Sequence, residues 1–116
     1  MKSDTRCIIH SDLTDDHILV DSTGKFAGVI DFGDAMIGDP AFDYIFLWNY
    51  GDETAKQIYE NYKFKGDEKL LARSYWHYVR FLADSLYFAC KENKKEEIEL
   101  YKDKLNTAWE KFPSLN

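Results

Sequence analysis

Two aspartates and a histidine near the start of this 116-residue chain have the residue types and spacing to do chemistry. Asp12 follows the apolar run 7–9 by three residues, and Asp31 directly follows the apolar run 29–30. His17 lies between the two aspartates. If the fold brings these three side chains together, they offer a site to a hard cation such as Mg²⁺, which takes oxygen ligands and leaves room for substrate phosphates.

A β-hairpin is the element that must position these side chains. The apolar runs 18–20 and 26–30 flank the turn-rich segment 21–24, whose sequence is Asp-Ser-Thr-Gly. This pattern predicts two antiparallel strands joined by a turn. Residues 6–9 are expected to form a short buried strand beside them. Such an arrangement would gather the candidate ligands at one end of a small sheet.

Helical patterns fill the rest of the chain. Asp39 and Pro40 form an N-cap and first-turn pair, so a buried helix is expected from there to Gly51. Further helices are predicted over 52–62, 67–91 and 94–112. The expected inward stripes are Leu71, Tyr75, Tyr78, Val79, Leu82, Leu86 and Cys90 on the third helix and Ile98, Tyr101, Leu105, Ala108 and Trp109 on the last. The fold class is therefore α+β, with a catalytic and hairpin region over 1–40 and a helical subdomain over 41–116 in one structural unit.

Composition bounds the function. A hydrophobic fraction of 45% and an aromatic fraction of 16% suit a packed core and argue against disorder. The formal net charge of -6 disfavours nucleic acid and anionic membranes as partners and favours cationic ligands. Cys7 and Cys90 are too few for a disulfide framework and are read as free, buried thiols. With no signal peptide and no long apolar span, a cytoplasmic location is expected.

Two sequence blocks carry a family resemblance. Residues 10–17, His-Ser-Asp-Leu-Thr-Asp-Asp-His, resemble the H-x-D-x-x-x-x-N catalytic loop of kinase-like phosphotransferases. Residues 30–34, Ile-Asp-Phe-Gly-Asp, followed by 38–43, Gly-Asp-Pro-Ala-Phe-Asp, resemble the metal-binding segment of the aminoglycoside phosphotransferase and choline kinase superfamily. The usual asparagine is replaced by His17, as in the version of the motif found in aminoglycoside 2″-phosphotransferases.

The resemblance implies a role for each motif residue. Asp12 would be the catalytic base that accepts the hydroxyl proton, although an ordinary loop aspartate that caps a turn fits the same position. Asp31 would hold Mg²⁺ against the phosphates of ATP or GTP, the alternative being an aspartate satisfied by backbone amides at a strand end. His17 would be a metal ligand or would hold a metal-bound water. His10 and Asp43 would support the loop.

Candidate substrate contacts are less specific. Asp34 and Asp39 either face a polyamine substrate or cap turns. Trp48, Trp76 and Trp109 are more simply core residues, but Trp76 lies off the main helical stripe beside His77, and it is a candidate for substrate contact.

The resemblance covers the C-terminal portion of such a kinase. Met1 lies nine residues before His10, which leaves no room for a nucleotide-binding lobe. The expected function is γ-phosphoryl transfer from a nucleotide to a hydroxyl of an aminoglycoside or a similar cationic acceptor, with choline, homoserine and sugar-like acceptors open. The chain is expected to self-associate or to pair with a missing N-terminal lobe. Two alternatives are a truncated, inactive remnant and a metal-dependent phosphohydrolase that uses Asp12 and Asp31.

Overall fold

The structure is a computed structural model that describes residues 6–62 and 67–112. Its N-terminal part holds two separate antiparallel strand pairs, one nested inside the other along the chain. The outer pair is β1 (Cys7–Ile9) with β4 (Met36–Gly38), and the inner pair is the hairpin of β2 (Ile18–Val20) and β3 (Phe26–Val29). The predicted hairpin is confirmed. The expected single small sheet is wrong, because β1 pairs with β4 and not with the hairpin.

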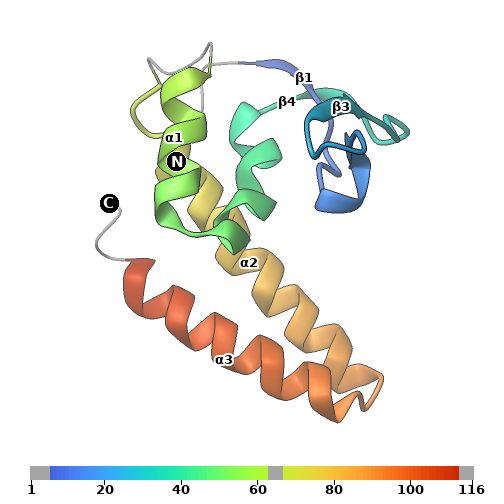
Figure 1. Ribbon diagram of the computed structural model, residues 1–116. Coiled ribbons are helices and arrows are strands. Elements are labelled where there is room, and N and C mark those ends of the chain that lie inside the picture. The colour runs from blue at the N-terminus through green and yellow to red at the C-terminus, as the bar shows by residue number, and fades with distance from the viewer. Residues whose placement is uncertain (1–5, 63–66, 113–116) are drawn as a thin grey trace.

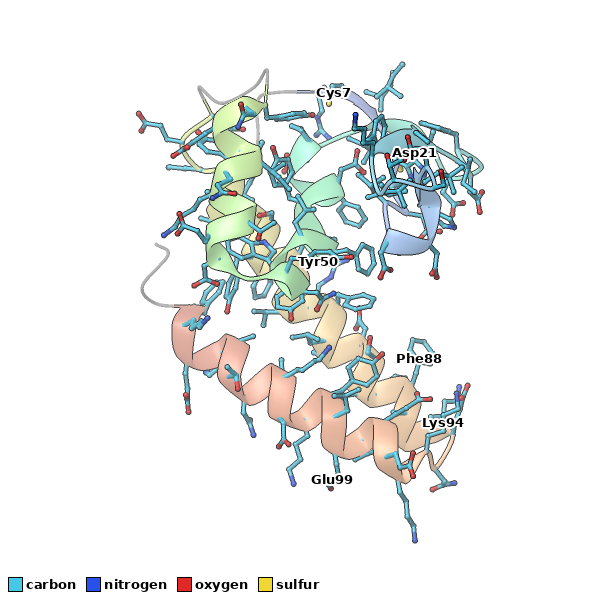
Figure 2. The ribbon with its side chains drawn as sticks, viewed as in Figure 1. Cys7, Asp21, Tyr50, Phe88, Lys94 and Glu99 are labelled. Carbon is cyan, nitrogen blue, oxygen red and sulfur yellow. The ribbon has the colours of Figure 1, made fainter. Side chains whose placement is uncertain are left out.

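The side chain of Asp21 holds the turn between β2 and β3 (Figure 2). Asp21 Oδ1 accepts hydrogen bonds from the amides of Thr23 and Lys25, at 2.8 and 3.1 Å, and from the Thr23 hydroxyl at 2.7 Å. Gly24 follows with a φ of 81°, in the left-handed region that costs glycine least. These contacts fix the register of β2 against β3 and lower the pKa of Asp21, with the Thr23 hydroxyl as the largest cause.

Four helices follow the strands, as predicted (Figure 1). The first is η2 (Pro40–Tyr50), a long 3₁₀ helix whose capping carboxylate, Asp39, accepts from Ala41 N. Next come α1 (Asp52–Asn61), α2 (Leu70–Lys91) and α3 (Lys95–Lys111). In Figure 1, η2 lies between α1 and the strands, and α2 and α3 form a helical hairpin below them.

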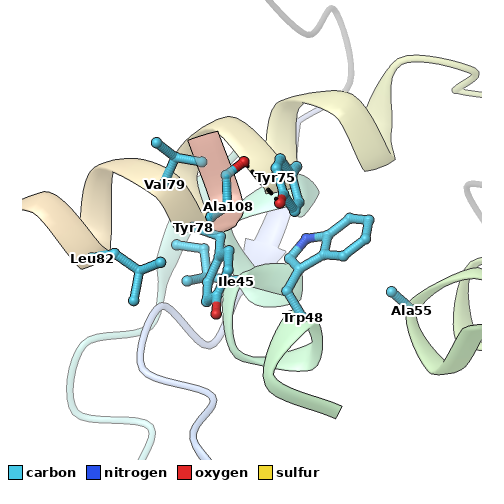
Figure 3. Close-up of a cluster of buried hydrophobic side chains, with 8 residues drawn as sticks. All are labelled: Ile45, Trp48, Ala55, Tyr75, Tyr78, Val79, Leu82 and Ala108. Carbon is cyan, nitrogen blue, oxygen red and sulfur yellow. Dashed lines mark hydrogen bonds between the residues drawn. The ribbon is translucent and has the colours of Figure 1, made fainter. Parts of the chain in front are cut away.

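The core lies where α2 packs against η2 and α3 (Figure 3). Polar atoms that enter it are paired: Trp48 Nε1 donates to Ser74 Oγ, and Tyr75 Oη donates to the Ala108 carbonyl, each at 3.0 Å. Because a buried aromatic side chain brings a large apolar area and needs a partner for its polar tip, these bonds fix the relative positions of the helices. The buried members of the cluster are Ile45, Trp48, Ala55, Tyr75, Tyr78, Val79, Leu82 and Ala108.

Three burial predictions are wrong. Trp109 is 60% exposed, Cys90 is exposed and Ile8 is 79% exposed, whereas each was expected inside. The C-terminal part of α2 extends past η2 and packs on α3 alone, so its buried face is narrower and takes Ala89 in place of Cys90. Ile8 is exposed because a two-stranded pair buries only the face that meets η2. No helix among the described residues is both long and apolar enough to cross a membrane.

Candidate active site

Asp12, His17 and Asp31 come together as the candidate ligand set. One ligand atom from each lies within 4.8 Å of the others. His17 Nε2 is 3.4 Å from Asp31 Oδ2, and His17 Nδ1 is 3.7 Å from Asp12 Oδ2. The loop after β1 supplies Asp12, the short 3₁₀ helix η1 (Asp15–His17) supplies the histidine, and the segment after β3 supplies Asp31.

The orientation of the His17 ring is set by the backbone of Asp12. Its Nδ1 lies 2.7 Å from the Asp12 carbonyl oxygen, which only accepts, so Nδ1 carries the proton. In the neutral ring the lone pair is therefore on Nε2, the atom nearest Asp31. The same hydrogen bond is the largest cause that raises the pKa of His17, followed among the raising causes by the charges of Asp12 and Asp31.

His10 connects the loop that carries Asp12 to the end of the segment before Asp31. The Asp12 amide donates to His10 Nδ1 at 3.2 Å, and His10 Nε2 donates to the Ile30 carbonyl at 2.7 Å. These partners require the neutral tautomer with its proton on Nε2. The ring is 5% exposed and packs against Phe32 at a centroid distance of 4.7 Å. His10 thus holds Asp12 at a fixed place relative to the residue before Asp31.

Asp43 holds the beginning of the loop that carries Asp12. Its two carboxylate oxygens accept from His10 N and Ser11 N, both at 2.9 Å. Asp43 lies in the first turn of η2, so the loop is fastened to the helical part of the molecule. Ser11, whose amide binds Asp43, has a φ of 72°. This left-handed conformation is unfavourable for a residue other than glycine.

Asp31 also has a left-handed backbone, with a φ of 61°. Aspartate and asparagine adopt this conformation more readily than most residues, and for any residue but glycine it costs on the order of 1 kcal/mol. The side chain of Asp31 is 60% exposed. The strained backbone therefore turns a carboxylate out of the strand end toward His17, where a ligand from solvent reaches it.

Asp39, a candidate substrate contact or turn cap, makes its described contacts within the fold. Its carboxylate caps η2 through Ala41 N and receives Arg73 Nε and Nη2 at 2.8 and 3.0 Å. The other side of the Arg73 guanidinium binds Asp67 at 2.6 and 3.0 Å. Both oxygens of the Asp39 carboxylate therefore accept hydrogen bonds within the fold, and the cap that the sequence offered for this residue is present. Asp34 is exposed in the turn after Asp31.

A cavity of about 250 Å³ opens beside Asp12. Trp76 is not in its wall. That side chain lines a separate, mostly apolar cavity of about 360 Å³ between α2 and α3, together with Trp109. The residues around the Asp12 cavity are Ser11, Asp12, Phe42, Ile45, Phe46, His77, Arg80, Phe81 and Asp84.

Sequence reasoning singled out His77 but missed Arg80 and Asp84. The spacing of His77, Arg80, Phe81 and Asp84 was available as a signal, because positions i, i+3, i+4 and i+7 share a helix face. Two charged residues on a face with two rings are unusual for a core stripe.

The fold and the two motif blocks define a class, the kinase-like phosphotransferases. The family model described as "Phosphotransferase enzyme family" matches residues 2–82, and the chain belongs to this family. A 56-residue stretch is 34% identical to the uncharacterized protein YcbJ of Bacillus subtilis (strain 168), covering 47% of this chain and 18% of that protein.

Solved aminoglycoside phosphotransferases have the same fold. The GDP complex of aminoglycoside 2'-phosphotransferase-IIIa superposes with a TM-score of 0.72 at 23% identity, covering 97% of this chain and 39% of that one. The gentamicin complex of APH(2")-IIa gives a TM-score of 0.62 at 23% identity, covering 87% and 35%. The described strands and helices thus correspond to a little over a third of the length of these proteins.

Proposed function

We propose that this chain is the catalytic and metal-binding segment of a kinase that transfers the γ-phosphoryl group of ATP or GTP to a hydroxyl of an aminoglycoside or a similar cationic small molecule. The observation that carries the proposal is the convergence of Asp12, His17 and Asp31 within 4.8 Å beside the cavity that Asp12 itself lines. Phosphoryl transfer needs positioning and electrostatic stabilisation more than covalent chemistry, and this site supplies both.

Asp12 is the proposed base. Its amide is held by His10 and its carbonyl by His17, so the backbone has little freedom to move. The side chain is 44% exposed, which leaves its carboxylate free to accept a hydrogen bond from an acceptor hydroxyl. In this role Asp12 orients the attacking oxygen and takes its proton.

Asp31 and His17 are the proposed ligands for Mg²⁺. The donor set fits this ion in its carboxylates, because Mg²⁺ is commonly held by one or two carboxylates and completes its shell with water and phosphate oxygens. The imidazole nitrogen suits it less well, so His17 Nε2 would contact either the ion or a water bound to it. When bound, the ion would neutralise charge on the transferred phosphoryl group.

Calorimetric titration of Mg²⁺ with ATP, and then with GTP, tests the proposal. We expect saturable binding to the wild-type chain and its loss in Asp31→Asn, which keeps the size of the side chain and tolerates the left-handed backbone. Asp34→Asn is the matched control, since it removes an equal charge three residues away. Equal affinities of wild type and Asp31→Asn would refute the metal site. Turnover of an aminoglycoside by wild type, absent in Asp12→Asn, would support the base.

The outward face of the β1–β4 pair supports a second proposal, that the isolated chain self-associates there. Ile8 and Ile37 are directly opposite in the register and are 79% and 71% exposed. Exposed apolar patches of this kind drive association, and in a longer chain a nucleotide-binding lobe would cover the same face. We expect light scattering to give a dimer or larger species at micromolar concentration, and a monomer for Ile8→Lys. A monomeric wild-type chain would contradict this proposal.

A further inference from the structure

Asp39 lies at the junction of two elements that support the loop carrying Asp12 (the Asp12 loop). On one side is β4, which ends at Gly38 and pairs with β1, the strand from which this loop departs. On the other side is η2, which begins at Pro40 and carries Asp43, the residue that binds the first two amides of the loop. In Figure 1, β4 runs directly into η2 at this point. Both supports of the Asp12 loop therefore meet at a single residue.

Arg73 holds this junction from the first turn of α2. Its Nε and Nη2 atoms donate to the two carboxylate oxygens of Asp39, at 2.8 and 3.0 Å. The arginine is 3% exposed, and its Nη1 and Nη2 atoms also donate to Asp67 on the other side. A planar guanidinium that binds a carboxylate through two bonds fixes its direction as well as its position. Arg73 thus fixes Asp39 relative to the helical core.

The Asp12 loop needs such a support because part of its backbone is strained. The φ of 72° at Ser11 persists in a residue other than glycine only where surrounding contacts impose it. The hydrogen bond from the Ser11 amide to Asp43 Oδ1, at 2.9 Å, is one of these contacts. If Asp43 shifts, Ser11 can relax toward an unstrained conformation, and Asp12, the next residue in the chain, moves with it.

A continuous path of contacts leads from α2 to the Asp12 loop. It runs from Arg73 to Asp39 through two hydrogen bonds and along the first turn of η2 to Asp43. That turn is joined to Asp39 twice, because Ala41 N donates to the carboxylate and Phe42 N donates to the carbonyl, each at 3.0 Å. A displacement of Asp39 is therefore passed on to Asp43 and to the two amides that it binds.

We infer that Arg73 is a positioning residue for Asp12: it fixes the supports of the Asp12 loop and does not touch the substrate. This inference rests on the proposed function only in taking Asp12 as the base, since the path from Arg73 to the loop involves no reaction. A reacting group that is misplaced by about 1 Å can lower the rate on the order of 100-fold. Perturbing Arg73 should therefore lower turnover more than it weakens the binding of an acceptor.

Hydrogen exchange followed by NMR, on the wild-type chain and on Arg73→Lys, is the test. Lysine keeps the charge but cannot bind two carboxylates through a planar fork. We expect the Ser11 amide and the His10 Nε2–H, which donate to Asp43 and to the Ile30 carbonyl, to exchange at least about 10-fold faster in the variant. This factor corresponds to the loss of one charge-assisted hydrogen bond. The measurement needs neither metal nor nucleotide.

Tyr75→Phe is the matched control. It removes a buried hydrogen bond of the same helix, from Tyr75 Oη to the Ala108 carbonyl, which joins α2 to α3 and not to η2. The amide of Leu82, buried in the middle of α2, reports the loss of global stability in each variant. Where the losses differ, a low concentration of urea brings the two variants to equal exchange at Leu82. The loop protons should then exchange as in wild type in Tyr75→Phe and faster in Arg73→Lys.

Equal acceleration at the loop in both variants, or none in Arg73→Lys, would overturn the inference. Where the wild-type chain phosphorylates an acceptor, Arg73→Lys should lower kcat about 10- to 100-fold and leave KM nearly unchanged. A raised KM with the kcat of wild type would also overturn the inference. A wild-type chain without turnover would refute the proposed function, and the exchange pattern would still decide whether Arg73 positions the loop.

Discussion

Arg73 fastens the N-terminal ends of η2 and α2, and its removal should be the most damaging single charge change in the helical part. The residue is 3% exposed and donates to Asp39 and Asp67, whose side chains are 20% and 16% exposed. We expect Arg73→Met, which keeps a long apolar side chain, to lower the free energy of unfolding by about 3–5 kcal/mol, because it removes the buried guanidinium that both carboxylates bind.

The pKa of Asp39 determines how the stabilisation by Arg73 changes with pH. Burial alone would raise it, but the hydrogen bonds from Arg73 and Ala41 outweigh burial and lower it. A carboxyl whose folded-state pKa is lowered stabilises the fold above its unfolded pKa, near 3.8, and loses that contribution as the pH falls through the folded value. The deficit of Arg73→Met should therefore be largest near neutral pH and should shrink in acid.

Urea unfolding followed by circular dichroism measures both quantities. Arg73→Lys keeps the charge but not the two-sided hydrogen bonding, and should fall between wild type and Arg73→Met. Adding Asp39→Asn and Asp67→Asn to Arg73→Met should recover part of the loss, since neutral amides are cheaper to bury. A deficit below about 1 kcal/mol, the scale of an exposed ion pair, or one that is the same at pH 7 and in acid, would refute the reasoning.

Two further predictions concern the strands and the site. The pKa of His17 is raised from its ordinary value of 6.5, so protons compete with the metal for this side chain above that pH. The affinity for Mg²⁺ should therefore fall as the pH drops through this region in wild type but not in His17→Asn. A flat wild-type profile would rule out His17 as a ligand. In the metal-free chain, His17 has the opposite effect of pH on the stability of the fold. A group whose folded-state pKa is raised stabilises the fold below its unfolded pKa, and this contribution is lost as the pH rises through the folded pKa. Gly38→Ala would place a Cβ 2.7 Å from Ile9 Cδ1 and should lower the free energy of unfolding, measured by thermal unfolding, by about 1–3 kcal/mol. Gly28→Ala, with open space around it, should change little. Equal stabilities of these two variants would count against the packing argument.

The site was largely predictable because its motifs are local. Asp12, His17 and Asp31 were chosen from two short blocks and a hairpin, and the structure brings their ligand atoms together. The hydrogen bond from His10 to the Ile30 carbonyl could not be predicted from the sequence, because it depends on where a loop crosses a strand end in the folded chain. Asp39 was left between two roles, since its partner Arg73 lies 34 positions away in the chain.

The helices were predictable in order and extent, but their buried faces were not. A periodic stripe says which residues share a face, and only the neighbours decide how far that face stays covered. Tyr75, Tyr78 and Leu82 are buried because η2 and α3 both meet α2 there. Cys90 continues its stripe beyond the covered region, whereas Trp109 follows the buried Ala108 and lies at the edge of the covered face beside Trp76. The 3₁₀ geometry of η2 also left no clear mark in the sequence.

The pairing of β1 with β4 has a consequence for how the site assembles. Residues 10–35 form a closed loop once Cys7 pairs with Gly38, and all three candidate ligands belong to that loop. Closing it costs chain entropy, and Asp43 can hold the start of the Asp12 loop only once it is closed, so the complete site should form late and open early. A cation bound to His17 and Asp31 would join two points of that loop and raise the melting temperature with its concentration. Binding of the metal and completion of the fold would then be a single equilibrium.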